Sequence, residues 1–349
     1  MKRKFYRLTA LLLGIVMLFG YQEGFVSEAK GKKPVVIVID PGHGGTGGTN
    51  EGGIFAPNVE KYVTLLTAQA MKQTLEQFEG VKVYMTRTKD VEVSLENRAE
   101  IAQKYGADFL FSLHYNMSAD HSLYGTEVWT SAFGTDYAAG QTFAAIHLAD
   151  MQAAYGLYGR GAKVRLNSRG TDYYGVIRAA HARNIPCVII EHCYLDNAND
   201  NPLVASQEQM IQFGVTDALS VAKYFHLKSE ALGLDFTDYA APSAAAPAGG
   251  KAFPDQTPPV VGAVTVSKRD AQGKVQVVLE ARDEESKILY YSYSTDGGLT
   301  WSALQKWPGA EKNGASFSVT VPAGSNSLLF RVHNQYDLAT DPLTAPIPS

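Results

Sequence analysis

The chain has 349 residues, of which 45% are apolar and 19% charged, so it has the material for a sizeable core and general disorder is excluded. Its 31 basic and 35 acidic residues give a net charge of -4 without a basic patch. This balance argues against nucleic acid as a partner and against docking onto an anionic surface by bulk charge. The length favours two domains over one.

Residues 1–29 have the features of an export signal. Basic side chains precede an apolar run at 10–19, and Ser27 and Ala29 are small residues at the two positions that a signal peptidase requires. The run is too short for a comfortable membrane span. We therefore predict a cleaved signal peptide, no stable membrane span after cleavage, and a secreted or cell-wall location in a bacterium; a retained N-terminal anchor is the alternative.

Residues 34–226 alternate between strand and helix patterns, which predicts an α/β domain with a mainly parallel twisted sheet flanked by helices. The expected strands are 35–40, 81–86, 109–114, 126–130 and 187–191. The expected helices are 58–78, with Asn58 as N-cap, and 94–105, 136–155, 172–183 and 206–225. Cys187 and Cys193 are the only cysteines, and their spacing favours a buried, reduced pair.

Residues 227–259 are expected to form a linker that is rich in Ala, Pro and Gly from residue 240. From 260 to 347, short alternating runs separated by turn residues predict an accessory β-sandwich of the immunoglobulin or fibronectin kind. Within it, residues 292–301 (SYSTDGGLTW) match the Asp-box pattern, which predicts a structural hairpin turn. The tyrosines and tryptophans of this region offer either a stacking surface for sugars or, as we favour, an aromatic core.

The stretch VVIVIDPGHGG at 35–45 predicts a buried strand that delivers His43 to a glycine-rich loop. Two other apolar strands also finish in a polar residue, which is His114 in FSLHYN and Glu191 in VIIEHC. Because the carboxyl ends of parallel strands share one edge of a sheet, these three side chains are expected to converge on one cleft.

Glu60 is a fourth candidate, in the first turn of the helix that follows the glycine-rich loop. A helix start favours a carboxylate without any function. However, two histidines and one glutamate form a typical three-ligand catalytic zinc set, here His43, Glu60 and His114, with the fourth position left to a water that becomes a nucleophile. The cofactor expected is Zn2+, and Glu191 fits the role of general base and acid.

Several segments occur in a fixed order over about residues 34–226, namely DPGHGG, NVEK, RTKDVEVSLENRAEIA, ADFLFSLHYN, GTEV and PCVIIEHCYLDN. Together they resemble the zinc-dependent N-acetylmuramoyl-L-alanine amidases of the amidase-3 type. The resemblance implies that His43, Glu60 and His114 hold zinc and that Glu191 is catalytic. It also implies peptidoglycan as the substrate, cleaved at the amide between N-acetylmuramic acid and the L-alanine of the stem peptide.

The last motif departs from the family pattern, with Cys193 at a glycine position, Tyr194 at the aromatic position and Asp196 where serine is usual. Asn116 lies two residues after His114, so a strand would place both on one face, where Asn116 could bind substrate; a plain turn role is the alternative. Arg98 matches a family arginine, for which we favour a structural ion pair.

Two other functions stay open at this point. The protein could be a wall-binding or regulatory protein with an inactive amidase scaffold, in which the β-domain provides the activity. It could also be a zinc hydrolase for a different amide or peptide. In each case the C-terminal domain is a candidate for contact with wall polymers.

Overall fold

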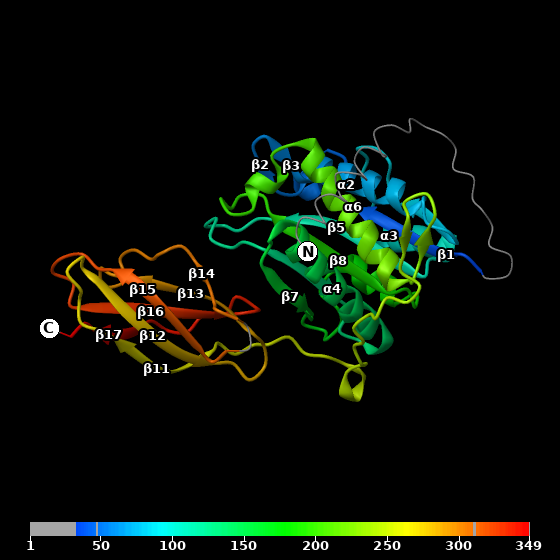
Figure 1. Ribbon diagram of the computed structural model, residues 1–349. Coiled ribbons are helices and arrows are strands. Elements are labelled where there is room, and N and C mark those ends of the chain that lie inside the picture. Colours follow the sequence, from blue (N-terminus) through cyan, green and yellow to red (C-terminus); the bar gives the residue numbers. More distant parts are fainter. Residues whose placement is uncertain (1–32, 47, 310–311, 349) are drawn as a thin grey trace. The chain divides into compact units, whose positions relative to one another are not determined.

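The computed structural model describes residues 33–46, 48–309 and 312–348. The predicted signal peptide at 1–29 lies outside these residues. The chain divides into two compact units, residues 1–253 and 254–349 (Figure 1). Within the described ranges, no helix combines the length and apolar character needed to cross a membrane.

The first unit is built on a six-stranded sheet with the order β4-β1-β5-β8-β6-β7. Its strands are β4 (Val81–Met85), β1 (Val35–Pro41), β5 (Phe109–Asn116), β8 (Cys187–Tyr194), β6 (Thr126–Thr130) and β7 (Gly159–Lys163). The first four are parallel, whereas β6 pairs antiparallel with β8 and parallel with β7. The predicted mainly parallel sheet is confirmed. Because β6 and β7 run in the opposite direction, their amino ends lie at the edge where β1, β5 and β8 end.

Helices cover both faces of this sheet (Figure 1). One face packs against α2 (Glu60–Leu75), α4 (Gly134–Tyr155) and α6 (Gln207–Tyr224), and the other against α3 (Leu95–Tyr105) and α5 (Gly175–His181). Strand β1 shows why: Ile37 and Ile39 belong to the first core, while Val38 belongs to the second. Because both faces of β1 are buried, its sequence is a continuous apolar run without alternation.

Short elements complete the first unit. They are η1 (Gly48–Glu51), β2 (Ile54–Phe55), β3 (Asn58–Val59), η2 (Asn201–Val204), β9 (Lys228–Ser229), β10 (Leu234–Asp235) and η3 (Ala248–Gly250). The expected N-cap of α2 is wrong: Val59 occupies that position, and the Asn58 side chain donates to the Val204 carbonyl oxygen at 3.1 Å instead. The Asn58 side chain is therefore engaged in a tertiary hydrogen bond and does not cap the helix. Both cysteines are buried and free.

Residues that follow α6 pack on the first unit. Phe236 stacks on Phe78 with ring centroids 6.2 Å apart, and Leu232 and Leu234 contact the same core. Further along, the amide of Ala252 donates to the Ala132 carbonyl oxygen at 2.7 Å. The sequence predicts a linker over residues 227–259, whereas in the structure the first unit extends to residue 253. Strands β9 and β10 pair as a small hairpin. Leu232, Leu234 and Phe236 are spaced two apart, so they share one face, and this face packs on the core.

The second unit contains two antiparallel sheets. The three-stranded sheet has β11 (Val260–Val266), β12 (Lys274–Arg282) and β15 (Gly314–Thr320). The four-stranded sheet has β14 (Gln305–Lys306), β13 (Ile288–Ser294), β16 (Ser327–Asn334) and β17 (Leu343–Pro346). Side chains from both sheets form one core, which includes Tyr291 stacked on Phe317 at 4.1 Å. Tyr290 and Trp307 are also buried, as the aromatic-core alternative expects, whereas Tyr293 and Trp301 are half-buried.

The Asp box makes a turn between β13 and β14. The Asp296 carboxylate accepts from the Thr300 amide at 2.9 Å, and the Ser294 hydroxyl oxygen accepts from the Gly298 amide at 2.9 Å. Gly298 has a φ of 93°, which favours glycine. Trp301 lies under the Arg331 guanidinium at 4.0 Å. These contacts give the motif a structural role.

The packing of residues 228–236 leads to a stability prediction. Replacing Phe236 by alanine in the full chain should lower the unfolding temperature of the first unit by about 5 °C, since the loss of a half-buried aromatic side chain costs about 2 kcal/mol. Phe253, which is 72% exposed, is the matched control, and its replacement by alanine should cause little change. Scanning calorimetry measures both shifts. Equal shifts for the two variants would contradict packing of the hairpin on the core.

Candidate metal centre and catalytic edge

The glycine-rich loop at 42–45 holds His43 in a left-handed backbone conformation, with a φ of 61°. Two buried arginines bind its carbonyl oxygens: Arg98 donates to His43 O at 2.8 Å, and Arg87 donates to Gly42 O at 2.7 Å. Asp90 accepts from the Gly45 amide at 2.7 Å. These bonds fix a conformation that histidine adopts rarely.

Asp40, near the end of β1, stabilises the start of this loop. Its carboxylate is 1% exposed and accepts from Arg98 Nη1 at 2.6 Å, Thr86 Oγ1 at 2.5 Å and Ser112 Oγ at 2.7 Å. A buried charge is stable only when it is paired and hydrogen-bonded in this way. The structural ion pair predicted for Arg98 is present.

Glu60 brings the two predicted histidine ligands together. Glu60 Oε2 lies 3.2 Å from His43 Nε2, and Glu60 Oε1 lies 3.0 Å from His114 Nδ1. The two rings meet edge to face with centroids 4.9 Å apart. The backbone amides of Gly53 and Tyr115 donate to the same carboxylate at 2.7 and 3.0 Å. Three residues from β5, α2 and the loop after β1 therefore share one centre.

The electrostatics of this centre favour an ionised Glu60 and a neutral His114 imidazole. Burial alone would raise the pKa of Glu60, but the hydrogen bonds and charges of His114 and His43 outweigh it and lower that pKa. Burial lowers the pKa of His114. An ionised carboxylate and a neutral imidazole are the forms in which glutamate and histidine bind a metal ion.

The residues present fit a metal ion. Among the described residues, His43, Glu60 and His114 form the one group of potential ligands whose donor atoms all lie within 4.8 Å of one another. Two glycines make room for them: a Cβ on Gly42 would lie 2.3 Å from His114 Cε1, and a Cβ on Gly52 would lie 2.4 Å from Glu60 Oε2. Two imidazoles and one carboxylate are a donor set that zinc accepts in catalytic sites.

Glu191 lies on β8, in register with His114 on β5 and with Glu127 on β6. Its Oε2 atom is buried and has no hydrogen-bond partner in the described parts of the chain. Burial, followed by the negative charges of Glu60 and Glu127, raises the pKa of Glu191 well above its usual range. A carboxyl group with this environment is suited to proton transfer.

Glu127 is a site residue that the sequence pattern did not single out. It is 3% exposed, and its carboxylate accepts from Asn116 Nδ2 at 3.0 Å, Arg160 Nε at 2.7 Å and Lys163 Nζ at 2.6 Å. Burial would raise the pKa of Glu127, but the charges and hydrogen bonds of Lys163 and Arg160 lower it to about 2. Glu127 therefore stays ionised beside Glu191. The motif GTEV, with an acid inside an apolar strand, was the available signal.

Asn116 lies at the end of β5, where Glu127 fixes its amide. His192 points to the opposite face of β8 from Glu191, as strand alternation predicts. Its Nδ1 lies 2.9 Å from the His114 carbonyl oxygen, and its Nε2 lies 2.9 Å from Asp217 Oδ2 on α6. His192 thus connects the backbone of a candidate ligand to α6.

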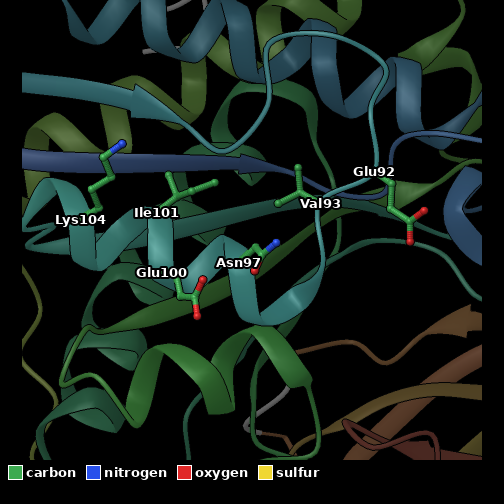
Figure 2. A pocket seen from close by; sticks show the side chains of 6 residues that line it. All are labelled: Glu92, Val93, Asn97, Glu100, Ile101 and Lys104. Atoms are coloured by element: carbon green, nitrogen blue, oxygen red, sulfur yellow. The ribbon is translucent and has the colours of Figure 1, made fainter.

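A separate hollow lies beside α3 and the residues before it. Figure 2 shows the side chains that line it, which are Glu92, Val93, Asn97, Glu100, Ile101 and Lys104. The residues that line this hollow do not include any of the four predicted site residues, which are His43, Glu60, His114 and Glu191. The candidate site is therefore the edge where β1, β5 and β8 end.

The fold and the site define an α/β domain with a His-Glu-His centre and a nearby acid at one sheet edge. The family of N-acetylmuramoyl-L-alanine amidases known as Amidase_3 matches residues 37–223. The chain belongs to this family, which confirms the family and enzyme class expected from its motifs.

The chain is similar to several individual proteins over part of its length. The chain is 29% identical over 202 residues to N-acetylmuramoyl-L-alanine amidase CwlM of Bacillus licheniformis, covering 57% of this chain and 72% of CwlM. It is 31% identical over 201 residues to the probable cell wall amidase LytH of Staphylococcus aureus, covering 56% of this chain and 61% of LytH. Among solved structures, the catalytic domain of CwlV from Bacillus (Paenibacillus) polymyxa var. colistinus is 27% identical, with a TM-score of 0.45, and the match covers 56% of this chain and 99% of that domain.

The pairing of Glu127 predicts a specific pH dependence. Because its pKa in the folded protein lies below the ordinary glutamate value of 4.5, at about 2, its contribution is present above pH 4.5 and is lost as the pH falls toward about 2. Glu127→Gln should therefore lower the free energy of unfolding by roughly 3 kcal/mol at pH 7, and the difference from wild type should shrink on acidification.

Urea unfolding between pH 7 and pH 3 measures this difference. Glu230→Gln, at an exposed carboxylate, is the control and should follow wild type at every pH. A Glu127→Gln variant as stable as wild type at pH 7 would contradict the assigned ion pairs.

Proposed function

We propose that this peptidoglycan amidase is an exported, zinc-dependent enzyme that cleaves the amide between N-acetylmuramic acid and the L-alanine of the stem peptide. One observation carries the proposal. The ligand set His43, Glu60 and His114 and the acid Glu191 come from four separate parts of the chain, yet they meet at one edge of the sheet.

In this proposal, His43, Glu60 and His114 hold the zinc ion. When bound, zinc acts as a Lewis acid toward the scissile carbonyl and lowers the pKa of water. Glu191 takes the proton of the attacking water and delivers it to the amine of L-alanine as the carbon–nitrogen bond breaks and a carboxylate forms on the lactyl group. Its Oε2 atom is suited to this transfer, since no described residue occupies it by a hydrogen bond.

Asn116 is the proposed substrate contact. Glu127 accepts from its Nδ2 atom, and its Oδ1 atom accepts from the Met117 amide at 3.1 Å. These bonds fix the carboxamide plane at the end of β5, beside the scissile bond in this proposal. A fixed amide orients a substrate without losing further side-chain freedom.

Replacing Glu191 by glutamine tests the proposed proton transfer. The variant keeps the size of the side chain but removes the proton acceptor, so turnover on purified peptidoglycan should fall on the order of a thousandfold. Zinc content, measured on the purified protein by plasma emission spectrometry, should stay at the wild-type level. Wild-type turnover of Glu191→Gln would show that the proposed mechanism is wrong.

Matched histidine variants distinguish loss of the zinc ion from loss of the Glu191 carboxyl group. His114→Ala should lose both zinc and turnover, whereas His226→Ala, at an exposed position after α6, should keep both. Mass spectrometry of the digest identifies the bond: stem peptides that begin with free L-alanine support the proposal. Zinc-dependent release of another amine would favour a different substrate, and no release would favour an inactive scaffold.

Export is the remaining part of the proposal. The basic residues and apolar run at 1–19 and the small residues before Lys30 support it. The protein recovered from the medium or wall of an expressing bacterium should begin at Lys30 in N-terminal sequencing. Recovery of an uncut chain with the membrane fraction would favour the anchor. Contact of the second unit with wall polymers stays a prediction.

A further inference from the structure

Aromatic side chains extend the catalytic edge across the same face of the sheet. Trp129 follows Glu127 by two positions on β6, so both point to one face, and Glu127 is in register with Glu191. Lys163 Nζ, which binds Glu127, lies 5.4 Å from the Trp129 ring centroid. Tyr174 lies 5.1 Å from Trp129. A continuous path of contacts therefore leads away from Glu191.

The path ends in an arginine. The rings of Tyr174 and Tyr173 meet edge to face at 5.3 Å, and the Arg165 guanidinium lies 3.8 Å over the Tyr173 ring. We refer to Trp129, Tyr173, Tyr174 and Arg165 as the stem strip.

The loop that carries Arg165 and Tyr173 is held in place. The Tyr173 amide donates to Arg165 O at 2.8 Å, and Asn167 Oδ1 accepts from the amides of Arg169 and Thr171 at 2.9 and 3.2 Å. Asp172 accepts from the Ala132 amide at 2.9 Å. A ligand would therefore meet a preformed surface.

Arg165 differs from the other cations of this region. Arg160 and Lys163 are buried and paired with Glu127. Arg165 is exposed, and no carboxylate pairs with it in the described parts of the chain. Its guanidinium is positioned by stacking on the Tyr173 ring, while its charge is available to a ligand.

We propose that the stem strip binds the peptide stem of the substrate, with Arg165 paired to a stem carboxylate and the aromatic rings against the stem backbone. This inference rests on the proposed function. Uncharged N-acetylated sugars offer no partner for the Arg165 charge, whereas the stem carries carboxylates. Arg160 and Lys163 are already paired with Glu127, so the exposed guanidinium of Arg165 is the cation of this region that a stem carboxylate can bind.

Two synthetic muramyl peptides test the proposal, one with free stem carboxylates and one with the same stem fully amidated. Wild type should cleave the charged substrate with a kcat/KM about tenfold above that of the amidated one. Arg165→Gln should lose this preference through a higher KM for the charged substrate. Arg169→Gln, at an exposed arginine on the same loop, is the control and should keep the preference.

Other outcomes overturn the inference. An equal loss on both substrates would assign Arg165 a structural role or a contact with the glycan, and an unchanged preference would remove it from recognition. These results differ from failure of the proposed function, in which wild type releases no L-alanine-terminated peptide from either substrate.

Discussion

The buried carboxylate of Asp40 is the constraint on which the catalytic edge depends. It lies at the end of β1, and Arg98 binds it while also donating to the carbonyl oxygens of Pro41 and His43. One guanidinium thus neutralises the strand end and holds the loop that follows. Since a buried charge without its partner is costly, the loop has little freedom to move without breaking this pair. The left-handed backbone of His43 is one result of that restriction.

Two glutamates that face each other across β6 and β8 show how environment assigns different roles to one side-chain type. Glu127 is surrounded by donors and cations, so it stays ionised and acts as a fixed support for Asn116. Glu191 has a buried oxygen without a hydrogen-bond partner among the described residues. Neighbouring acids whose pKa values are pushed apart are typical of sites that transfer protons. The ion pairs of Glu127 thus contribute to the chemistry at Glu191 through charge.

The sequence predicted the parts of the site that lie on apolar strands. Continuous apolar runs revealed β1, β5 and β8, and parallel topology then placed His43, His114 and Glu191 at one edge. The support around Glu127 was missed because its cations come from β7, the segment GRGAK, which has neither an apolar run nor alternation. Buried Arg160 and Lys163 are explained only by a partner from another strand. The contacts of residues 228–253 were hidden for a similar reason, since packing overrides a linker-like composition.

The departures from the family pattern after Glu191 are compatible with an intact catalytic edge. Cys193 lies in β8 among buried apolar residues, in extended backbone that does not require glycine. Asp196 accepts from the Ser118 amide at 3.0 Å and lies 2.7 Å from His121 Nδ1, which ties the end of β8 to the loop after β5. A carboxylate accepts two such donors more strongly than a serine hydroxyl. In this chain Asp196 thus holds the loop behind Glu191, and the four proposed catalytic groups lie at one edge of the sheet.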